Sequence, residues 1–155
     1  MLLYDDSRML KYTQSIVVKV PVEEAFRFVA APTNLPAFFP FLIQETVLER
    51  FPQGGYRAHS MMNVGGARIE FDAETTEYIP NQRIAGKNDD GGAWEWVFES
   101  DAEGTRITAS GESPLPAALA GRLSETSWNI QMESVIEMLL ANLKARLESR
   151  VPTSQ

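Results

Sequence analysis

The chain contains no cysteine and a single histidine, His59. Without cysteine there are no disulfides or thiolate ligands, and one imidazole does not supply a multi-histidine metal site. We expect a cytoplasmic protein, because a chain without cysteine suits a reducing compartment. No dinucleotide fingerprint, phosphate-cradling glycine loop or nucleophile elbow occurs, so we expect no metal and no other cofactor.

Long apolar runs and clusters of positive charge are also missing. No window approaches the about 20 apolar residues that cross a bilayer, and the first eight residues lack the charge and apolar run of a secretion signal. We therefore expect no membrane span. The 14 basic and 21 acidic residues give a net charge of -7, and Lys and Arg form no run. This composition argues against a nucleic-acid partner.

Alternation of apolar and polar residues dominates the rest of the sequence. A chain of 155 residues can bury its own core. We expect a single domain over residues 1–150 and a frayed tail at 151–155. Half-buried strands are predicted at 11–20, 42–51, 56–64, 67–79, 83–88, 93–100 and 105–112. Three glycine pairs, a Pro-Asn turn and the single Gly104 separate the last six stretches, and turns this short join antiparallel neighbours.

Two short helices are predicted between the first and second strands. Pro21 fits a first helical position, and Phe26 and Val29 share the apolar face of the helix that follows. A further helical turn is expected over residues 36–39, because Pro40 stops it.

A long helix is predicted from about residue 117 to 150, with a kink near Gly121. No proline interrupts this segment, and apolar residues recur at three- and four-residue spacing. The stripe consists of Leu123, Trp128, Met132, Val135, Ile136, Leu139, Leu143 and Leu147. Such a stripe must be buried, so we expect the helix to lie against the sheet.

The amino-terminal part carries a family resemblance. It reads SIVVKVPVEEAFRFV over residues 15–29 and continues as PTNLPAFFP over residues 32–40. A strand that ends in proline, an amphipathic helix and a turn with proline and aromatic residues resemble the opening of the START-related, birch-pollen-allergen-like (SRPBCC) superfamily. Its polyketide cyclase/dehydrase and lipid-transport branch is the nearest likeness.

The resemblance implies an α+β helix-grip fold. In that fold a seven-stranded curved antiparallel sheet wraps around a long carboxy-terminal helix, with two short helices between strands one and two. It also implies a cavity between sheet and helix. Proteins of this superfamily include lipid and sterol carriers, hormone receptors, cyclases, oxygenase subunits and chaperone-associated modules, so the fold alone does not choose a function.

Aromatic residues on the strand at 93–100 are the first candidates for ligand contact. Trp94, Trp96 and Phe98 share one face of it, where they either fill the core or line a pocket. Trp128 and Met132 on the long helix offer an opposite wall. The candidate ligand-binding residues are Phe38, Phe39, Tyr56, Ser60, Met62, Phe71, Trp94, Trp96, Phe98, Trp128, Met132 and Ile136.

Charged residues gather on the opposite face of the strand at 67–79. Arg68, Glu70, Asp72 and Glu74 alternate with apolar neighbours, and we interpret them as a solvated surface instead of a metal or acid/base site. Parity along the preceding strand places His59 on the same solvent side.

Three functions remain open at this point. The first is binding of a small hydrophobic molecule, lipid- or polyketide-like, between sheet and helix. The second is a cyclase or dehydratase that uses the same pocket, with Tyr56, Ser60 and Tyr78 as its polar groups. The third is a protein-interaction module with a packed interior. The ligand and the oligomeric state do not follow from the sequence.

Overall fold

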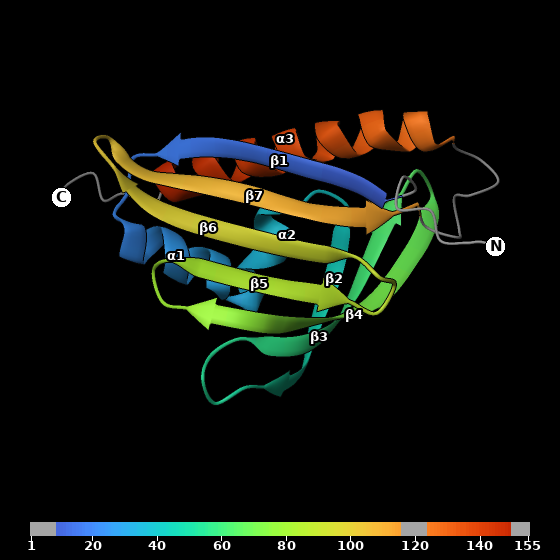
Figure 1. Cartoon of the computed structure of the whole chain (residues 1–155), viewed down its shortest axis with the longest axis horizontal. Coiled ribbons are helices and arrows are strands. Elements are labelled where there is room, and N and C mark those ends of the chain that lie inside the picture. Colours follow the sequence, from blue (N-terminus) through green and yellow to red (C-terminus); the bar gives the residue numbers. More distant parts are fainter. Residues whose placement is uncertain (1–8, 116–123, 150–155) are drawn as a thin grey trace.

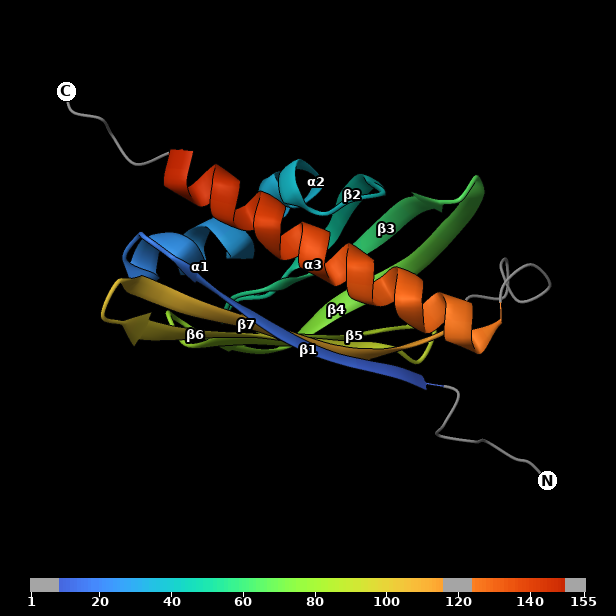
Figure 2. The same cartoon turned by 90° about the horizontal axis from the view of Figure 1, so that it is seen from above.

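Seven antiparallel strands form one curved sheet, and a long helix lies across its concave face (Figure 1, Figure 2). The computed structural model describes residues 9–115 and 124–149. The elements are β1 (Met9–Val18), α1 (Val22–Ala30), the 3₁₀ turn η2 (Pro32–Asn34), α2 (Leu35–Phe38), β2 (Leu42–Arg50), β3 (Tyr56–Val64), β4 (Ala67–Ile79), β5 (Arg83–Asn88), β6 (Ala93–Asp101), β7 (Gly104–Pro114) and α3 (Glu125–Ser149). This arrangement confirms the predicted α+β helix-grip fold.

The sheet is a six-strand meander that β1 extends at one side. The strand order is β1-β7-β6-β5-β4-β3-β2, so β1 and β2 form the two edges. Short turns impose this order, because each hairpin places consecutive strands beside each other. Glycines at Gly54, Gly65 and Gly91 adopt positive φ in these turns, a conformation that costs glycine little.

The core lies between the concave face of the sheet and the helices. Leu143 and Leu147 of α3 are fully buried, as is Ile107 of β7. α1 covers one end of the sheet, where the rings of Phe26 and Phe98 meet edge to face with centroids 5.2 Å apart. Each large apolar side chain buried in this way contributes about 1.5 to 3 kcal/mol. The predicted stripe from Trp128 to Leu147 is therefore the inner face of α3, while its first member, Leu123, lies outside the described residues.

β1 ends earlier than predicted. The expected strand ran to residue 20, but the ladder stops at Val18. Beyond it the Val20 carbonyl accepts a hydrogen bond from the buried Thr105 hydroxyl at 2.8 Å, and the Lys19 amide donates to the Glu148 carboxylate at 3.0 Å. These side-chain partners replace the ladder bonds, which lets the chain turn into α1.

α3 runs from Glu125 to Ser149, and the predicted start near residue 117 lies outside the described residues. The Ser124 hydroxyl accepts a hydrogen bond from the Ser127 amide at 3.1 Å, which is the usual capping interaction at a helix start. The expected kink near Gly121 and the tail at 151–155 lie outside the described residues. No helix in the described part of the chain is long and apolar enough to cross a membrane.

Candidate functional site

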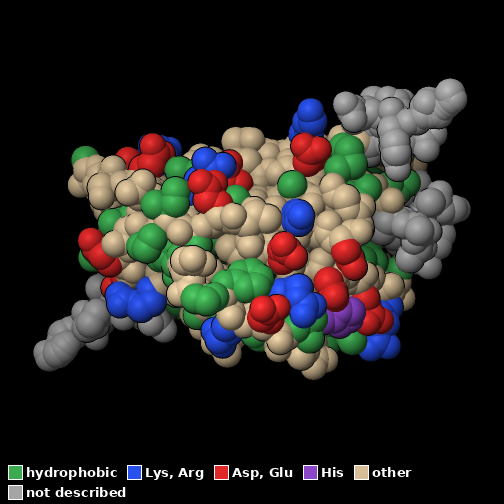
Figure 3. All heavy atoms as spheres, turned by 60° about the horizontal axis from the view of Figure 1, so that its bottom comes forward, with side chains coloured by type: hydrophobic (Ala, Val, Ile, Leu, Met, Phe, Trp, Pro, Cys, Tyr) green, Lys and Arg blue, Asp and Glu red, His purple; other side chains and the backbone are tan. Residues whose placement is uncertain are grey.

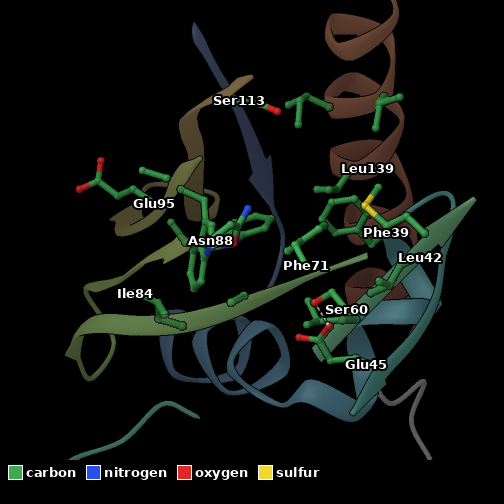
Figure 4. A pocket seen from close by; sticks show the side chains of 18 of the residues that line it. Phe39, Leu42, Glu45, Ser60, Phe71, Ile84, Asn88, Glu95, Ser113 and Leu139 are labelled. Atoms are coloured by element: carbon green, nitrogen blue, oxygen red, sulfur yellow. Dashed lines mark hydrogen bonds between the residues drawn. The ribbon is translucent and has the colours of Figure 1, made fainter. Parts of the chain in front are cut away.

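A cavity of about 190 Å³ lies between the concave face of the sheet and α3 (Figure 4). Its walls come from all seven strands, from α1, α2 and α3, and from the turn between α2 and β2. An apolar cavity of about 150 Å³ is large enough to bind benzene, whereas sites for drug-sized ligands have about 300 to 1,000 Å³. The space therefore suits one ring or two fused rings. The interaction-module hypothesis requires a fully packed interior, and this cavity shows that the interior is not fully packed.

Most of the predicted contact residues border this cavity. They come from the turn after α2, from β3, β4 and β6, and from α3, and they comprise Phe39, Tyr56, Ser60, Met62, Phe71, Trp94, Trp96, Trp128, Met132 and Ile136. Figure 4 shows Phe39, Phe71 and Ser60 directed toward a common space. Tyr78, the further polar group of the enzyme hypothesis, also lies in the wall.

Two of the predicted contact residues, Phe38 and Phe98, do not line the cavity. Phe38 is 1% exposed and packs edge to face on Trp96, with ring centroids 6.2 Å apart. Phe98 is covered by Phe26 of α1. Phe98 lies on the inner face of β6, as predicted, but other side chains occupy the space in front of both rings.

The three tryptophans of the chain all line the cavity. The Trp94 indole fits over Gly86 on the neighbouring strand, where an added Cβ would lie 2.1 Å from a ring carbon. Its Nε1 donates to the Asn88 Oδ1 at 3.1 Å, which fixes the ring in the plane of the wall. Trp128 is 4% exposed, and its buried Nε1 has no hydrogen-bond partner among the described residues.

A carboxyl group that sequence analysis missed stands in the same wall. Glu45 of β2 accepts a hydrogen bond of 2.5 Å from the Ser60 hydroxyl of β3, and Figure 4 shows the two side chains together. The Tyr56 side chain is hydrogen-bonded to Glu45 as well. Burial raises the pKa of Glu45 above its usual 4.5, against the opposing effect of these hydroxyls. Burial and the neighbouring carboxyl both raise the pKa of Tyr56.

A β-bulge explains why the strand pattern hid Glu45. Strict alternation from Leu42 places Gln44 on the inner face and Glu45 on the outer face. The register instead pairs Leu42 with Met62 and Glu45 with Ser60, so one extra residue is inserted between them. Glu45 turns inward, and Ile43 is left 55% exposed on the outside. No local sequence signal marks the bulge.

A further hydroxyl in the cavity wall belongs to Tyr12 of β1. Tyr12 lines the cavity, and burial raises its pKa to about 12. The phenol therefore stays protonated over the whole physiological range. It is a neutral hydroxyl next to the apolar space.

The outer face of β3 and β4 carries the charged row that the sequence predicts as surface. His59 bridges two carboxylates, with Nδ1 2.7 Å from Asp72 and Nε2 2.8 Å from Glu70. Both hydrogen bonds raise the pKa of His59 above 6.5, and the bond to Asp72 has the larger effect. Figure 3 shows acidic and basic side chains gathered around the histidine. The described residues contain no group of ligands that would hold a metal ion.

Comparison with known protein families gives one match over most of the chain. A family model described as "Polyketide cyclase / dehydrase and lipid transport" matches residues 9–148. A search of curated proteins found no match.

Solved structures with the same fold include aromatase/cyclases. The Zhui aromatase/cyclase from Streptomyces sp. R1128 has a TM-score of 0.75 at 20% identity, over 94% of this chain and 97% of that one. The di-domain ARO/CYC StfQ from the steffimycin biosynthetic pathway has a TM-score of 0.74 at 15% identity over 94% of this chain, which spans 54% of StfQ. An AHSA1-like protein from Aeromonas hydrophila has a TM-score of 0.66 at 16% identity, over 94% and 97%. These similarities show the shared fold.

Proposed function

The chain belongs to the polyketide cyclase/dehydrase and lipid transport family, and we propose that it binds one small, largely aromatic molecule in the cavity between the sheet and α3. The observation that carries the proposal is the cavity of about 190 Å³ with Trp94, Trp96 and Trp128 in its walls. Flat rings gain dispersion and stacking contacts against such walls. The volume favours one or two fused rings over a long acyl chain.

Titration with naphthalene-sized compounds tests this function. The chain has three tryptophans and all line the cavity, so the three indole N–H signals in a ¹H–¹⁵N NMR spectrum report on this site alone. We expect saturable shifts of these signals on addition of 2-methylnaphthalene. Absence of any shift up to the solubility limit of the compound would contradict the proposal.

A matched pair of variants assigns the shifts to the cavity. Ala73→Leu adds volume to the cavity wall on β4 and is expected to abolish binding. Ala85→Leu adds the same atoms to β5 outside the cavity lining, at a position paired with Glu95, and is expected to leave binding unchanged. Equal binding by both variants would place the ligand elsewhere.

A cyclase or dehydratase-type reaction is the second candidate function. The specific observation in its favour is the Glu45 carboxyl with its Ser60 and Tyr56 partners on the cavity wall, because these groups can transfer protons. The test is deuterium exchange at the enolisable carbons of 2-tetralone, a two-ring ketone. We expect Glu45→Gln to abolish the exchange. Glu49→Gln, on the same strand but outside the cavity lining and paired with Arg57 at 3.8 Å, should preserve it. Equal exchange rates with and without the protein would exclude this role.

A further inference from the structure

The charges around the cavity have one sign. Its lining includes Glu45, Asp90, Glu95 and Glu112, and it contains no Lys, Arg or His from the described part of the chain. The Glu95 carboxylate already pairs with Arg83 at 2.6 Å, and Figure 4 shows Glu95 directed away from the labelled groups Ser60 and Glu45. Glu45 forms no salt bridge with any described residue. Asp90 and Glu112 form none in the described part of the chain either, but Glu45 is the one of the three whose carboxyl the Ser60 and Tyr56 hydroxyls hold at the cavity wall.

Glu45 has acceptor capacity that the protein does not use. Its described hydrogen-bond partners are the hydroxyls of Ser60 and Tyr56, and both donate to the carboxyl. An ionised carboxylate offers about four lone-pair sites and no donor. A ligand in the cavity therefore meets a group that can accept a further hydrogen bond and repels negative charge.

We propose that this cavity selects ligands that present a hydrogen-bond donor, a hydroxyl or an ammonium group, to Glu45 and that it rejects anionic ligands such as fatty acids. This selectivity rests on the proposed binding function. A hydrogen bond to an ionised acceptor is about twice as strong as one between neutral groups. A carboxylate ligand would add a second negative charge in a space of low polarity, where no cation of the wall compensates it.

Four naphthalene derivatives of similar size test the selectivity. They are 2-methylnaphthalene without a donor, 2-naphthol with a hydroxyl, 2-naphthylmethylamine with an ammonium group, and 2-naphthoate with a negative charge. Dissociation constants come from the indole N–H shifts at pH 7. We expect 2-naphthol or the amine to bind, and 2-naphthoate to bind at least about tenfold more weakly than 2-naphthol, the effect of roughly one lost charge-assisted hydrogen bond.

Glu45→Gln isolates the contribution of the carboxylate. We expect the affinity of the donor ligand, relative to that of 2-methylnaphthalene, to fall about five- to tenfold, because a neutral amide oxygen is a weaker acceptor. A larger fall for 2-naphthol than for the amine identifies the hydroxyl as the selected donor, and the reverse identifies the ammonium group. Glu49→Gln is the matched control, because Glu49 lies on the same strand outside the cavity lining and pairs with Arg57 at 3.8 Å; its affinity ratio should equal that of the unmodified protein.

The outcomes separate this inference from the function on which it rests. If 2-methylnaphthalene binds and 2-naphthoate binds as tightly as 2-naphthol, the selectivity is wrong and the binding function stands. This comparison uses the unmodified protein, so it holds even if Glu45→Gln does not fold. If Glu45→Gln folds and leaves the affinity of the donor ligand relative to 2-methylnaphthalene unchanged, the proposed selectivity is likewise overturned. If none of the four compounds shifts an indole signal, the binding function and the selectivity both fall.

Discussion

Replacement of Gly86 by alanine should disrupt the tryptophan wall of the cavity. The added Cβ would lie 2.1 Å from a carbon of the Trp94 ring, so the indole must move. Overpacking of this kind costs about 1 to 3 kcal/mol. Displacement of the ring also breaks the Nε1 hydrogen bond to Asn88, at about 1 kcal/mol. The gain of about 0.5 to 1 kcal/mol from removing a glycine within a strand offsets part of this. The expected net loss in the free energy of unfolding is about 2 kcal/mol.

A double-mutant cycle with Trp94→Ala tests the mechanism. Urea unfolding of the four proteins gives the coupling between the two positions, which should be about 2 kcal/mol. With the indole removed, Gly86→Ala should become neutral or stabilising, because nothing then occupies the space of the new Cβ. Gly66→Ala is the control, since no atom lies within 4 Å of its Cβ and its cost comes only from the φ of +85°. A cost of Gly86→Ala that is equal in both backgrounds, within about 0.5 kcal/mol, would refute this reasoning.

Three further predictions concern Trp96, Glu45 and His59. Trp96→Ala should destabilise the protein by about 3 to 5 kcal/mol in urea unfolding, because the ring is 9% exposed and packs on the core as well as on the cavity; a cost below about 1 kcal/mol would mark it as cavity wall alone. Glu45 has a folded-state pKa raised above 4.5, so the folded protein binds its proton more tightly than the unfolded chain does, and its presence costs stability above that pKa. Between pH 4.5 and 7, the free energy of unfolding of the unmodified protein should therefore rise relative to that of Glu45→Gln as the pH falls. A relative decrease would contradict the assigned burial of Glu45. His59 has its pKa raised above 6.5 by Asp72 and Glu70, so its stabilising effect is complete below pH 6.5 and is lost as the pH rises through the folded-state pKa; His59→Gln should lack this dependence in the same measurement.

Short-range patterns predicted most of the fold. The strands β3, β4 and β5 begin and end where alternation and turn residues place them. Parity alone also identified the inner face, because successive side chains of a strand point to opposite sides of the sheet. His59 and its acidic neighbours on β4 therefore fell correctly on the outside.

The candidate site was predicted less completely. Trp94, Trp96 and Trp128 could be found from strand parity and helical spacing, and all three border the cavity. Phe38 and Phe98 have the same inward orientation, yet packing against Trp96 and Phe26 fills the space before them. Orientation is a local property, whereas the presence of empty space depends on which distant side chains arrive there.

By itself, the sequence determined the order of the elements, the antiparallel pairing and the inner faces of sheet and helix, because hairpin turns and residue periodicity act within a few residues along the chain. Only the tertiary structure decided that Glu45 enters the cavity. The bulge that turns it inward lies in the pairing of β2 with β3, and that register is a property of the two strands together. The same holds for the cavity, because its walls combine side chains from strands and helices that lie far apart in the sequence.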